Sequence, residues 1–266
     1  MYGFSMMVFV NMTKCQKGKC SLNMAGEFMD PRSTASERKR FLMRNKLLDA
    51  AMRVYVRRDG PRPVIDDVIR EAKASRATFY NHFNSLDEVM AAIGEELSNQ
   101  MTTDIIPLYS VLVEPWQRIA VGFRLFLLRA LLDQTWAAYV TRVDAWPHDA
   151  LVARYMALDL QNGKASGQFH YERIDAVSDF LRGASARCIQ AIMEGVDDPN
   201  RYMDDSVRMT LAGLGCATAL CEKGVTFSLD YLQAWASGRI GAGTPKWIDK
   251  IDTEDGQRFM SYRLPT

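Results

Sequence analysis

The chain has 266 residues, of which 48% are hydrophobic and 24% are charged, and its 33 basic side chains nearly balance its 32 acidic ones. This composition excludes a wholly disordered chain and predicts one large domain or two. No apolar run reaches the ~18 to 20 residues needed to cross a bilayer. The apolar start Met1–Val10 also lacks the basic residues that precede a secretory signal core. We therefore expect a cytoplasmic protein without a membrane partner.

The residues that usually carry catalysis or bind metals are few and scattered. The three histidines, His82, His148 and His170, are too far apart in the sequence to indicate a paired metal site, and no second ligand pair follows Cys15 and Cys20. The odd total of five cysteines favours reduced thiols over a disulfide framework. The phosphate-loop, HExxH and GxSxG motifs are absent. We therefore expect no enzymatic activity, no catalytic residue, no cofactor and no metal.

Basic residues gather near the start of the chain. The segment from Arg32 to Pro63 contains ten basic and three acidic side chains, whereas the chain from Thr102 onward contains 17 basic and 20 acidic ones. A basic segment beside a nearly neutral remainder is typical of a nucleic-acid-binding module attached to another domain. Chance clustering on a solvated helix face is the alternative that charge alone leaves open.

The first 35 residues show no hydrophobic periodicity, and Pro31–Thr34 is typical of a linker. We expect residues 1–35 to form a disordered N-terminal extension, within which Met1, Met24 and Met29 are alternative translation starts.

A helical pattern then runs from Ser36 to Asp59, because apolar residues recur along it at helical spacing. The sequence Gly60–Pro63 ends this helix, and a short helix is predicted from Val64 to Ala72.

A third helix is predicted after Ser75, which is a favourable N-cap, with Phe79 and Phe83 facing inward. The sequence Ser85–Glu88 has the S-x-x-E pattern of a capping box and starts a fourth helix. Residues 36–101 are therefore predicted to form an all-helical domain.

The remainder of the chain also favours helices. Glu114-Pro115 starts one that runs toward Asp133. Further helical stretches are predicted at 134–145, 148–161, 171–194, 202–222 and 226–237. We expect a second helical domain over residues 102–237. Because the chain becomes glycine-rich and loses its periodicity after Ser237, we expect residues 238–266 to form a loose tail.

Two short helices separated by a tight turn form a helix-turn-helix pattern, and its residues resemble the TetR family of bacterial transcriptional regulators. The similarity begins at Leu47–Tyr55, continues through Ile65–Ala72 and Ser75–Phe83, and ends at Ser85–Glu88. The resemblance implies an all-α protein. In this fold class an N-terminal three-helix helix-turn-helix DNA-binding domain precedes a C-terminal helical ligand-binding and dimerisation domain.

The helix that begins after Ser75 carries side chains suited to DNA. Arginine can read guanine, asparagine can read adenine, and alanine or a threonine methyl can contact a thymine methyl. The resemblance implies that Tyr80 and His82 contact phosphates. The candidate DNA-binding residues are Lys46, Ile65, Asp66, Ser75, Arg76, Ala77, Thr78, Tyr80, Asn81 and His82. The alternatives are a core position for Tyr80, a helix-end hydrogen bond for His82 and a merely solvated Asn81.

The sequence departs from the family pattern at several positions. Lys73 stands at the turn position usually held by glycine, Ile69 replaces a small residue, and Leu86 replaces a lysine that contacts phosphate. Asp66 and Asp67 would repel phosphate unless they cap a helix or form ion pairs. These departures affect the expected strength of DNA binding rather than its mode.

The second domain contains a candidate dimer helix. Val207–Leu220 is rich in small residues and, together with Ile174–Met193, could form half of an intermolecular four-helix bundle; packing within one subunit is the alternative. The candidate ligand-pocket residues are Phe123, Trp136, Tyr139 and Tyr155, for which a core position is the alternative.

These observations predict a DNA-binding repressor that binds a palindromic operator as a homodimer and is released by a small apolar or aromatic effector. The alternative is a constitutive DNA-binding protein, or a helical protein-interaction module, without an effector.

Overall fold

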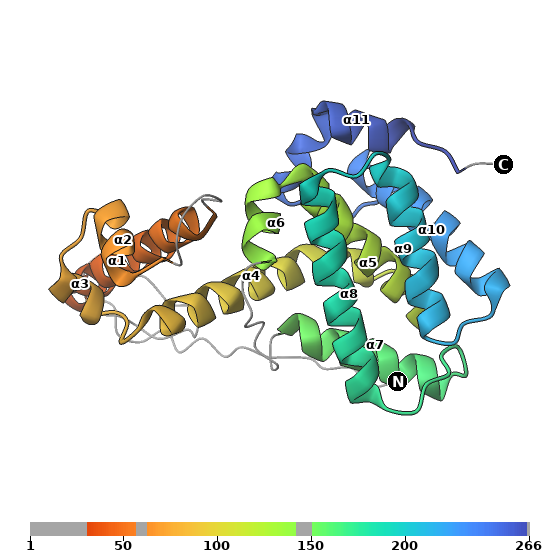
Figure 1. Ribbon diagram of the computed structural model, residues 1–266, viewed down its shortest axis with the longest axis horizontal. Coiled ribbons are helices and arrows are strands. Elements are labelled where there is room, and N and C mark those ends of the chain that lie inside the picture. Colours follow the sequence, from red (N-terminus) through yellow and green to blue (C-terminus); the bar gives the residue numbers. More distant parts are fainter. Residues whose placement is uncertain (1–30, 57–62, 142–150, 265–266) are drawn as a thin grey trace, which may run out of the picture.

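The structure is a computed structural model that describes residues 31–56, 63–141 and 151–264. Over these ranges every regular element is a helix and no strand occurs, which confirms the prediction of an all-α fold. The helices form a small N-terminal lobe and a larger C-terminal lobe, joined by one long helix (Figure 1). No helix in the described part of the chain is long and apolar enough to cross a membrane.

The N-terminal lobe contains three helices, which are α1 (Pro31–Val56), α2 (Ile65–Ala72) and α3 (Arg76–Tyr80). Their buried core includes Leu47, Val68 and Phe79, and an ion pair of 2.8 Å between Arg53 and Glu71 ties α1 to α2. Helix α1 begins five residues before the predicted Ser36, so the expected extension over residues 1–35 is wrong for its last five residues. Its first 30 residues lie outside the described part of the chain.

Helix α4 (Leu86–Tyr109) connects the two lobes. The Ser85 hydroxyl accepts a hydrogen bond from the Glu88 N–H at 3.1 Å, which confirms the predicted start of this helix. The helix continues without a break through Met101 and Thr102, both of which are buried. The expected domain boundary between residues 101 and 102 therefore falls inside one continuous helix, because apolar residues keep their helical spacing across it.

The C-terminal lobe is built around α5 (Pro115–Leu132), most of whose side chains are buried. Figure 1 shows this helix surrounded by its neighbours. The surrounding helices are α6 (Gln134–Val140), α7 (Leu151–Ala165), α8 (Ile174–Glu194), α9 (Pro199–Gly213) and α10 (Thr218–Ala236).

The predicted continuous helix Val207–Leu220 is wrong. Helix α9 ends at Gly213 and α10 begins only at Thr218. Between them Gly215 has a φ of +77° in the left-handed region, and a Cβ at this position would lie 2.6 Å from the carbonyl oxygen of His170. The run of small residues in Val207–Leu220 had suggested a helix that packs closely against a partner. It is interrupted at Gly215 by a turn whose backbone conformation favours glycine.

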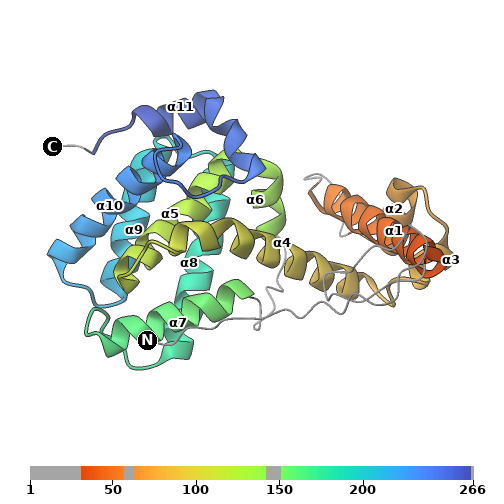
Figure 2. The same ribbon diagram turned by 180° about the vertical axis from the view of Figure 1, so that it is seen from behind.

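The expected loose tail over residues 238–266 is also wrong for most of its length. The chain forms a 3-10 helix, η1 (Lys246–Asp252), and a further helix, α11 (Glu254–Ser261). Trp247 and Phe259 are buried, and the indole N–H of Trp247 donates a hydrogen bond of 3.0 Å to the Asp104 carboxylate on α4. Figures 1 and 2 show α11 at the opposite end of the lobe from α7. Residues 265–266 lie outside the described part.

A charged side chain on α5 is enclosed in the C-terminal lobe. The Arg124 guanidinium is fully buried and donates hydrogen bonds to the Asp204 carboxylate at 2.7 Å and to the Ser228 hydroxyl at 2.9 Å. The Tyr262 hydroxyl donates to the second oxygen of Asp204 at 2.6 Å. A buried charge requires such partners, so this network joins α5, α9, α10 and the C-terminal segment.

Candidate DNA-binding helix and ligand cavity

The turn between α2 and α3 depends on one strained residue. Lys73 adopts the left-handed conformation, with φ 48° and ψ 46°, and follows the last residue of α2. The N–H of Ala74 then bonds to the Ile69 carbonyl at 3.0 Å, which closes the end of the helix. At the turn position where the family usually has glycine, Lys73 thus takes a backbone conformation that is unfavourable for a residue with a side chain.

Helix α3 is oriented by its cap and by two aromatic rings. The Ser75 hydroxyl accepts a hydrogen bond from the Thr78 N–H at 3.0 Å and lies 2.8 Å from the Thr78 hydroxyl. Phe79 and Phe83 are buried with their ring centroids 6.0 Å apart. The hydroxyls of Ser75 and Thr78 are therefore engaged in holding the start of α3, while the two phenylalanines anchor its inner side.

The outward side of α3 carries most of the predicted DNA-binding residues. Arg76, Ala77 and Asn81 are exposed. The Tyr80 side chain is 50% exposed, which contradicts the alternative that it is a core aromatic. Its ring meets Phe79 edge to face, with 5.6 Å between centroids. Helix α3 ends at Tyr80, so Asn81 and the half-buried His82 lie in the turn that follows.

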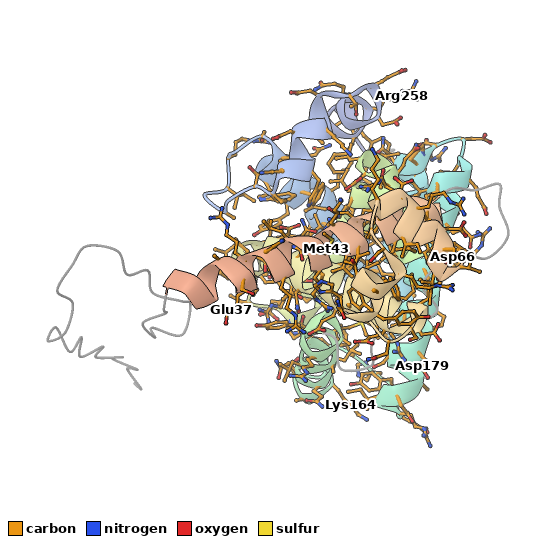
Figure 3. All side chains as sticks on the ribbon, turned by 90° about the vertical axis from the view of Figure 1, so that its left-hand side faces the viewer. Glu37, Met43, Asp66, Lys164, Asp179 and Arg258 are labelled. Atoms are coloured by element: carbon orange, nitrogen blue, oxygen red, sulfur yellow. The ribbon has the colours of Figure 1, made fainter. Side chains whose placement is uncertain are left out.

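The two acidic residues of α2 both have partners. Asp66 forms an ion pair of 3.0 Å with Arg76, and it lies on the surface of the N-terminal lobe in the end-on view of Figure 3. Asp67 accepts a hydrogen bond from the Val64 N–H at 3.1 Å and pairs with Arg70 at 3.3 Å. Asp66 is thus in an ion pair, and Asp67 both caps α2 and forms an ion pair, so the negative charge of each is partly neutralised.

The first helix adds positive charge beside α3. The pKa of His82 lies below its ordinary value, first because the imidazole is partly buried and then because Arg40 and Arg44 on α1 repel its protonated form. The Arg44 guanidinium also lies over the Phe83 ring, 4.4 Å from its centroid. His82 therefore stands in a cationic field that would favour an anion at this surface.

The two remaining candidates, Lys46 and Ile65, lie outside α3. Lys46 is exposed on α1. Ile65 is half-buried at the start of α2 and packs against the core, as Leu86 does at the start of α4. Ile65 is therefore partly engaged in core packing, whereas Arg76, Ala77 and Tyr80 on α3 are exposed.

A cavity of about 240 Å³ lies between the helices of the C-terminal lobe. Phe123 and Tyr155 line it, as predicted. Trp136 does not, because its ring packs near Phe126 and beneath the guanidinium of Arg129. The side chain of Tyr139 lies outside the described part of the structure. The other lining residues are Thr102, Ile106, Tyr109, Ser110, Arg118, Ile119, Gly122, Phe126, Val152, Met156, Asp159, Leu181, Ser185 and Thr210.

The cavity wall contains an ion pair that sequence reasoning missed. Nη1 of Arg118 on α5 donates a hydrogen bond of 2.9 Å to Oδ1 of Asp159 on α7. Burial raises the pKa of Asp159 and Arg118 opposes this shift. The Tyr109 hydroxyl from α4 donates to the Arg118 carbonyl at 2.9 Å. The position of Asp159 among apolar residues of α7 was the available sign of a buried ion pair. Nothing in the sequence indicated that its partner is Arg118.

Comparisons with known proteins agree with this geometry. Residues 47–93 match the family model of the tetR family of bacterial regulatory proteins. The chain is 30% identical over 91 residues to the uncharacterized HTH-type transcriptional regulator TtgW of Pseudomonas putida, which is 34% of this chain and 66% of that protein. It is 27% identical over 106 residues to the regulator Rv1255c of Mycobacterium tuberculosis, which is 40% of this chain and 52% of that protein. The chain thus matches between half and two thirds of these relatives' length.

Two solved structures share the fold. The resorcinol complex of RolR has a TM-score of 0.55 at 20% identity, over 71% of this chain and 95% of that one. A gamma-butyrolactone receptor has a TM-score of 0.51 at 14% identity, over 73% of this chain and 98% of that one. The matched helix-turn-helix sequence and the shared two-lobed helical fold lead to one conclusion. Residues 47–93 are a helix-turn-helix segment of the tetR family of bacterial regulatory proteins.

Proposed function

We propose that this protein is a DNA-binding transcriptional repressor that acts as a homodimer and leaves its operator when a small effector binds in the C-terminal cavity. The observation that carries the proposal is the outward surface of α3 and of the turn after it. Arg76, Tyr80 and Asn81 are exposed there, while Phe79 and Phe83 are buried on the inner side. This arrangement supports insertion of α3 into the major groove of DNA.

The side chains on this face suit two kinds of contact. Arg76 can read guanine through two hydrogen bonds and Asn81 can read adenine. Tyr80 and His82 suit phosphate oxygens, which position the protein without reading sequence. The basic surface of α1, including Arg40 and Arg44, supplies the electrostatic attraction that precedes specific binding.

An exposed apolar surface on α8 and α9 supports the homodimer. Phe180 is 54% exposed and Met209 is 69% exposed. A Cβ on Gly213 would lie 3.1 Å from the Phe180 ring, so Phe180 on α8 lies beside Gly213 at the end of α9. A two-fold pair built on this surface would use α8 together with α9. Helix α9 contains the first half of the predicted Val207–Leu220 segment. The pair would present two copies of α3 to grooves about 34–36 Å apart.

The cavity supports an effector. It is lined mainly by apolar and aromatic side chains, including Phe123 and Phe126, and the RolR structure with the same fold was solved with resorcinol. Residues from Thr102 to Ser110 place the last turns of α4 in its wall, and α4 also packs against α1 of the N-terminal lobe. A coupling of about 1–3 kcal/mol between the two sites would change operator occupancy some 5- to 150-fold.

The test is selection from a random double-stranded DNA pool with the purified full chain, followed by sequencing of the retained DNA. Enrichment of an inverted repeat with two half-sites supports the proposal. The Arg76→Ala variant should relax the motif at one base pair in each half-site, and the control Arg239→Ala, an exposed arginine in the C-terminal lobe, should leave it unchanged. A pool that stays random at moderate salt contradicts the proposal.

A further inference from the structure

We infer that the cavity takes a small neutral ring compound that donates a hydrogen bond to Asp159, such as a phenol, and that it discriminates against carboxylates and amines. This inference rests on the proposed function, because it assigns the chemical class of the effector to the same cavity.

The argument begins with the second oxygen of Asp159. The side chain lines the cavity and the residue is only 3% exposed. Oδ1 accepts the hydrogen bond from Arg118, and among the described residues no donor reaches Oδ2. Oδ2 is not fully enclosed by protein atoms, so it can accept a hydrogen bond from a molecule in the cavity that Asp159 lines. A ligand hydroxyl in the cavity would supply the missing hydrogen bond.

The charged residues of the wall leave no unpaired counter-ion for an ionic ligand. Arg118 and Asp159 are the charged residues that line the cavity, and they neutralise each other. A carboxylate would place a second negative charge beside Asp159, and an ammonium would lie close to Arg118, both in surroundings that screen charge poorly.

The Arg118 guanidinium already contacts acceptors within the protein. Nη1 is engaged with Asp159, and Nη2 lies 3.5 Å from the Tyr109 carbonyl. Nε is buried in the protein and has no partner among the described residues, but it is not exposed to the cavity. Both terminal nitrogens of Arg118 thus have an acceptor in the protein, whereas Oδ2 of Asp159 has no donor among the described residues.

The size and remaining lining favour one ring. Ile119, Phe123, Phe126 and Leu181 give an apolar and aromatic surface. An engineered apolar cavity of roughly 150 Å³ accommodates benzene, so a cavity of about 240 Å³ has room for a ring with one or two small substituents.

The experiment is isothermal titration of the full chain with four probes of similar size, which are phenol, toluene, benzoate and benzylamine. We expect phenol to bind about tenfold more tightly than toluene, because a hydrogen bond to a charged acceptor contributes this much. Benzoate and benzylamine should bind more weakly than toluene.

The variant Asp159→Asn keeps the shape of the wall and removes the charge. Arg118 then lacks its counter-ion, so the preference should change from phenol to benzoate. Toluene binding should persist and thereby report an intact cavity. Asp230→Asn, which alters an exposed acid on α10 away from the cavity, should leave all four affinities unchanged.

The outcomes separate this inference from the proposed function. Equal binding of benzoate and phenol to the unmodified protein overturns it, as does a phenol preference that survives in Asp159→Asn. Failure of all four probes to bind also overturns it. If the variant does not fold, the selectivity of the unmodified protein still decides. The proposed function is judged separately by the DNA selection, which uses none of these compounds.

Discussion

The guanidinium of Arg76, at the first position of α3, lies 3.0 Å from the carboxylate of Asp66 in the first turn of α2. Asp66 on α2 thus holds Arg76 on α3, which is the candidate residue best suited to read a base. Both side chains are more than half exposed, so the pair adds little to stability. We expect its effect on DNA recognition to be the orientation of the arginine.

The first prediction concerns this pair. Arg76→Ala should cost about 1–3 kcal/mol at one base pair of each half-site and relax specificity there. Asp66→Asn should reduce the same discrimination by a smaller amount while strengthening binding to random DNA, because it frees Arg76 and removes a negative charge near the phosphates. Fluorescence anisotropy with the selected operator and its single-base variants measures both effects. Glu96→Gln, an exposed change on α4, is the control, and unchanged discrimination in Asp66→Asn would refute the orienting role.

The second prediction separates the hydroxyl of Tyr80 from its ring. Tyr80→Phe keeps the edge contact with Phe79 and removes only the proposed phosphate contact. Operator and random DNA should lose affinity by the same factor, about 2- to 10-fold, which is the usual value of one hydrogen bond. Titration of both DNAs tests this. A loss confined to the operator would show that Tyr80 reads a base instead.

The third prediction concerns pH. Because partial burial, Arg40 and Arg44 lower the pKa of His82 below 6.5, the imidazole is neutral in the free protein near neutral pH. The unfolded chain binds the proton more readily, so the contribution of His82 to stability is present above pH 6.5 and is lost as the pH falls through the lower folded-state pKa.

A phosphate beside the ring would reverse this shift and promote protonation. Affinity for DNA should therefore rise as the pH falls from about 7.5 to about 6. The slope of affinity against pH should be smaller in His82→Gln than in the unmodified protein. An equal slope in both proteins would place His82 away from the phosphates.

The fourth prediction concerns stability. Lys73 has a φ of 48°, where a side chain costs about 1–2 kcal/mol. Lys73→Gly removes this strain but gives the unfolded chain more freedom, so the net gain should be about 0.5–1 kcal/mol. Urea unfolding measures it, with Lys73→Ala as the control that keeps the strain. A glycine variant no more stable than the alanine variant would mean that the turn is relaxed with lysine.

The features that could be predicted from the sequence are those encoded by neighbouring residues. The capping positions of Ser75 and Ser85 and the spacing of Phe79 and Phe83 located α3 and its inward side, because each depends on contacts within a few residues. The exposed residues of α3 followed, since the burial of one side of a short helix leaves the other side exposed.

The features that the sequence did not reveal depend on contacts between distant segments. Arg118 and Asp159 are separated by 41 positions, and no local pattern pairs them. The C-terminal segment is held by Trp247 and Ile248 in η1 and by Phe259 in α11, and both elements are too short to show a hydrophobic periodicity. Trp136 was expected in the cavity because it is aromatic, but the nearby Arg129 provides it with a different partner.

Helix α4 connects the cavity wall to the N-terminal lobe, so a small tilt at one end displaces the other end by a larger distance. From Leu86 to Pro107 it is about 32 Å long at 1.5 Å per residue, with one end under the helix-turn-helix and the other in the cavity wall. Pro107 removes a backbone hydrogen bond from the cavity end, which makes bending easiest there. A tilt of about 5° at that point would displace the far end of a 32 Å rod by about 3 Å. If the proposed effector tilted α4 by this angle, it would move the cavity wall by less than the width of one atom. The same tilt would move α3 by nearly the spacing of one base pair.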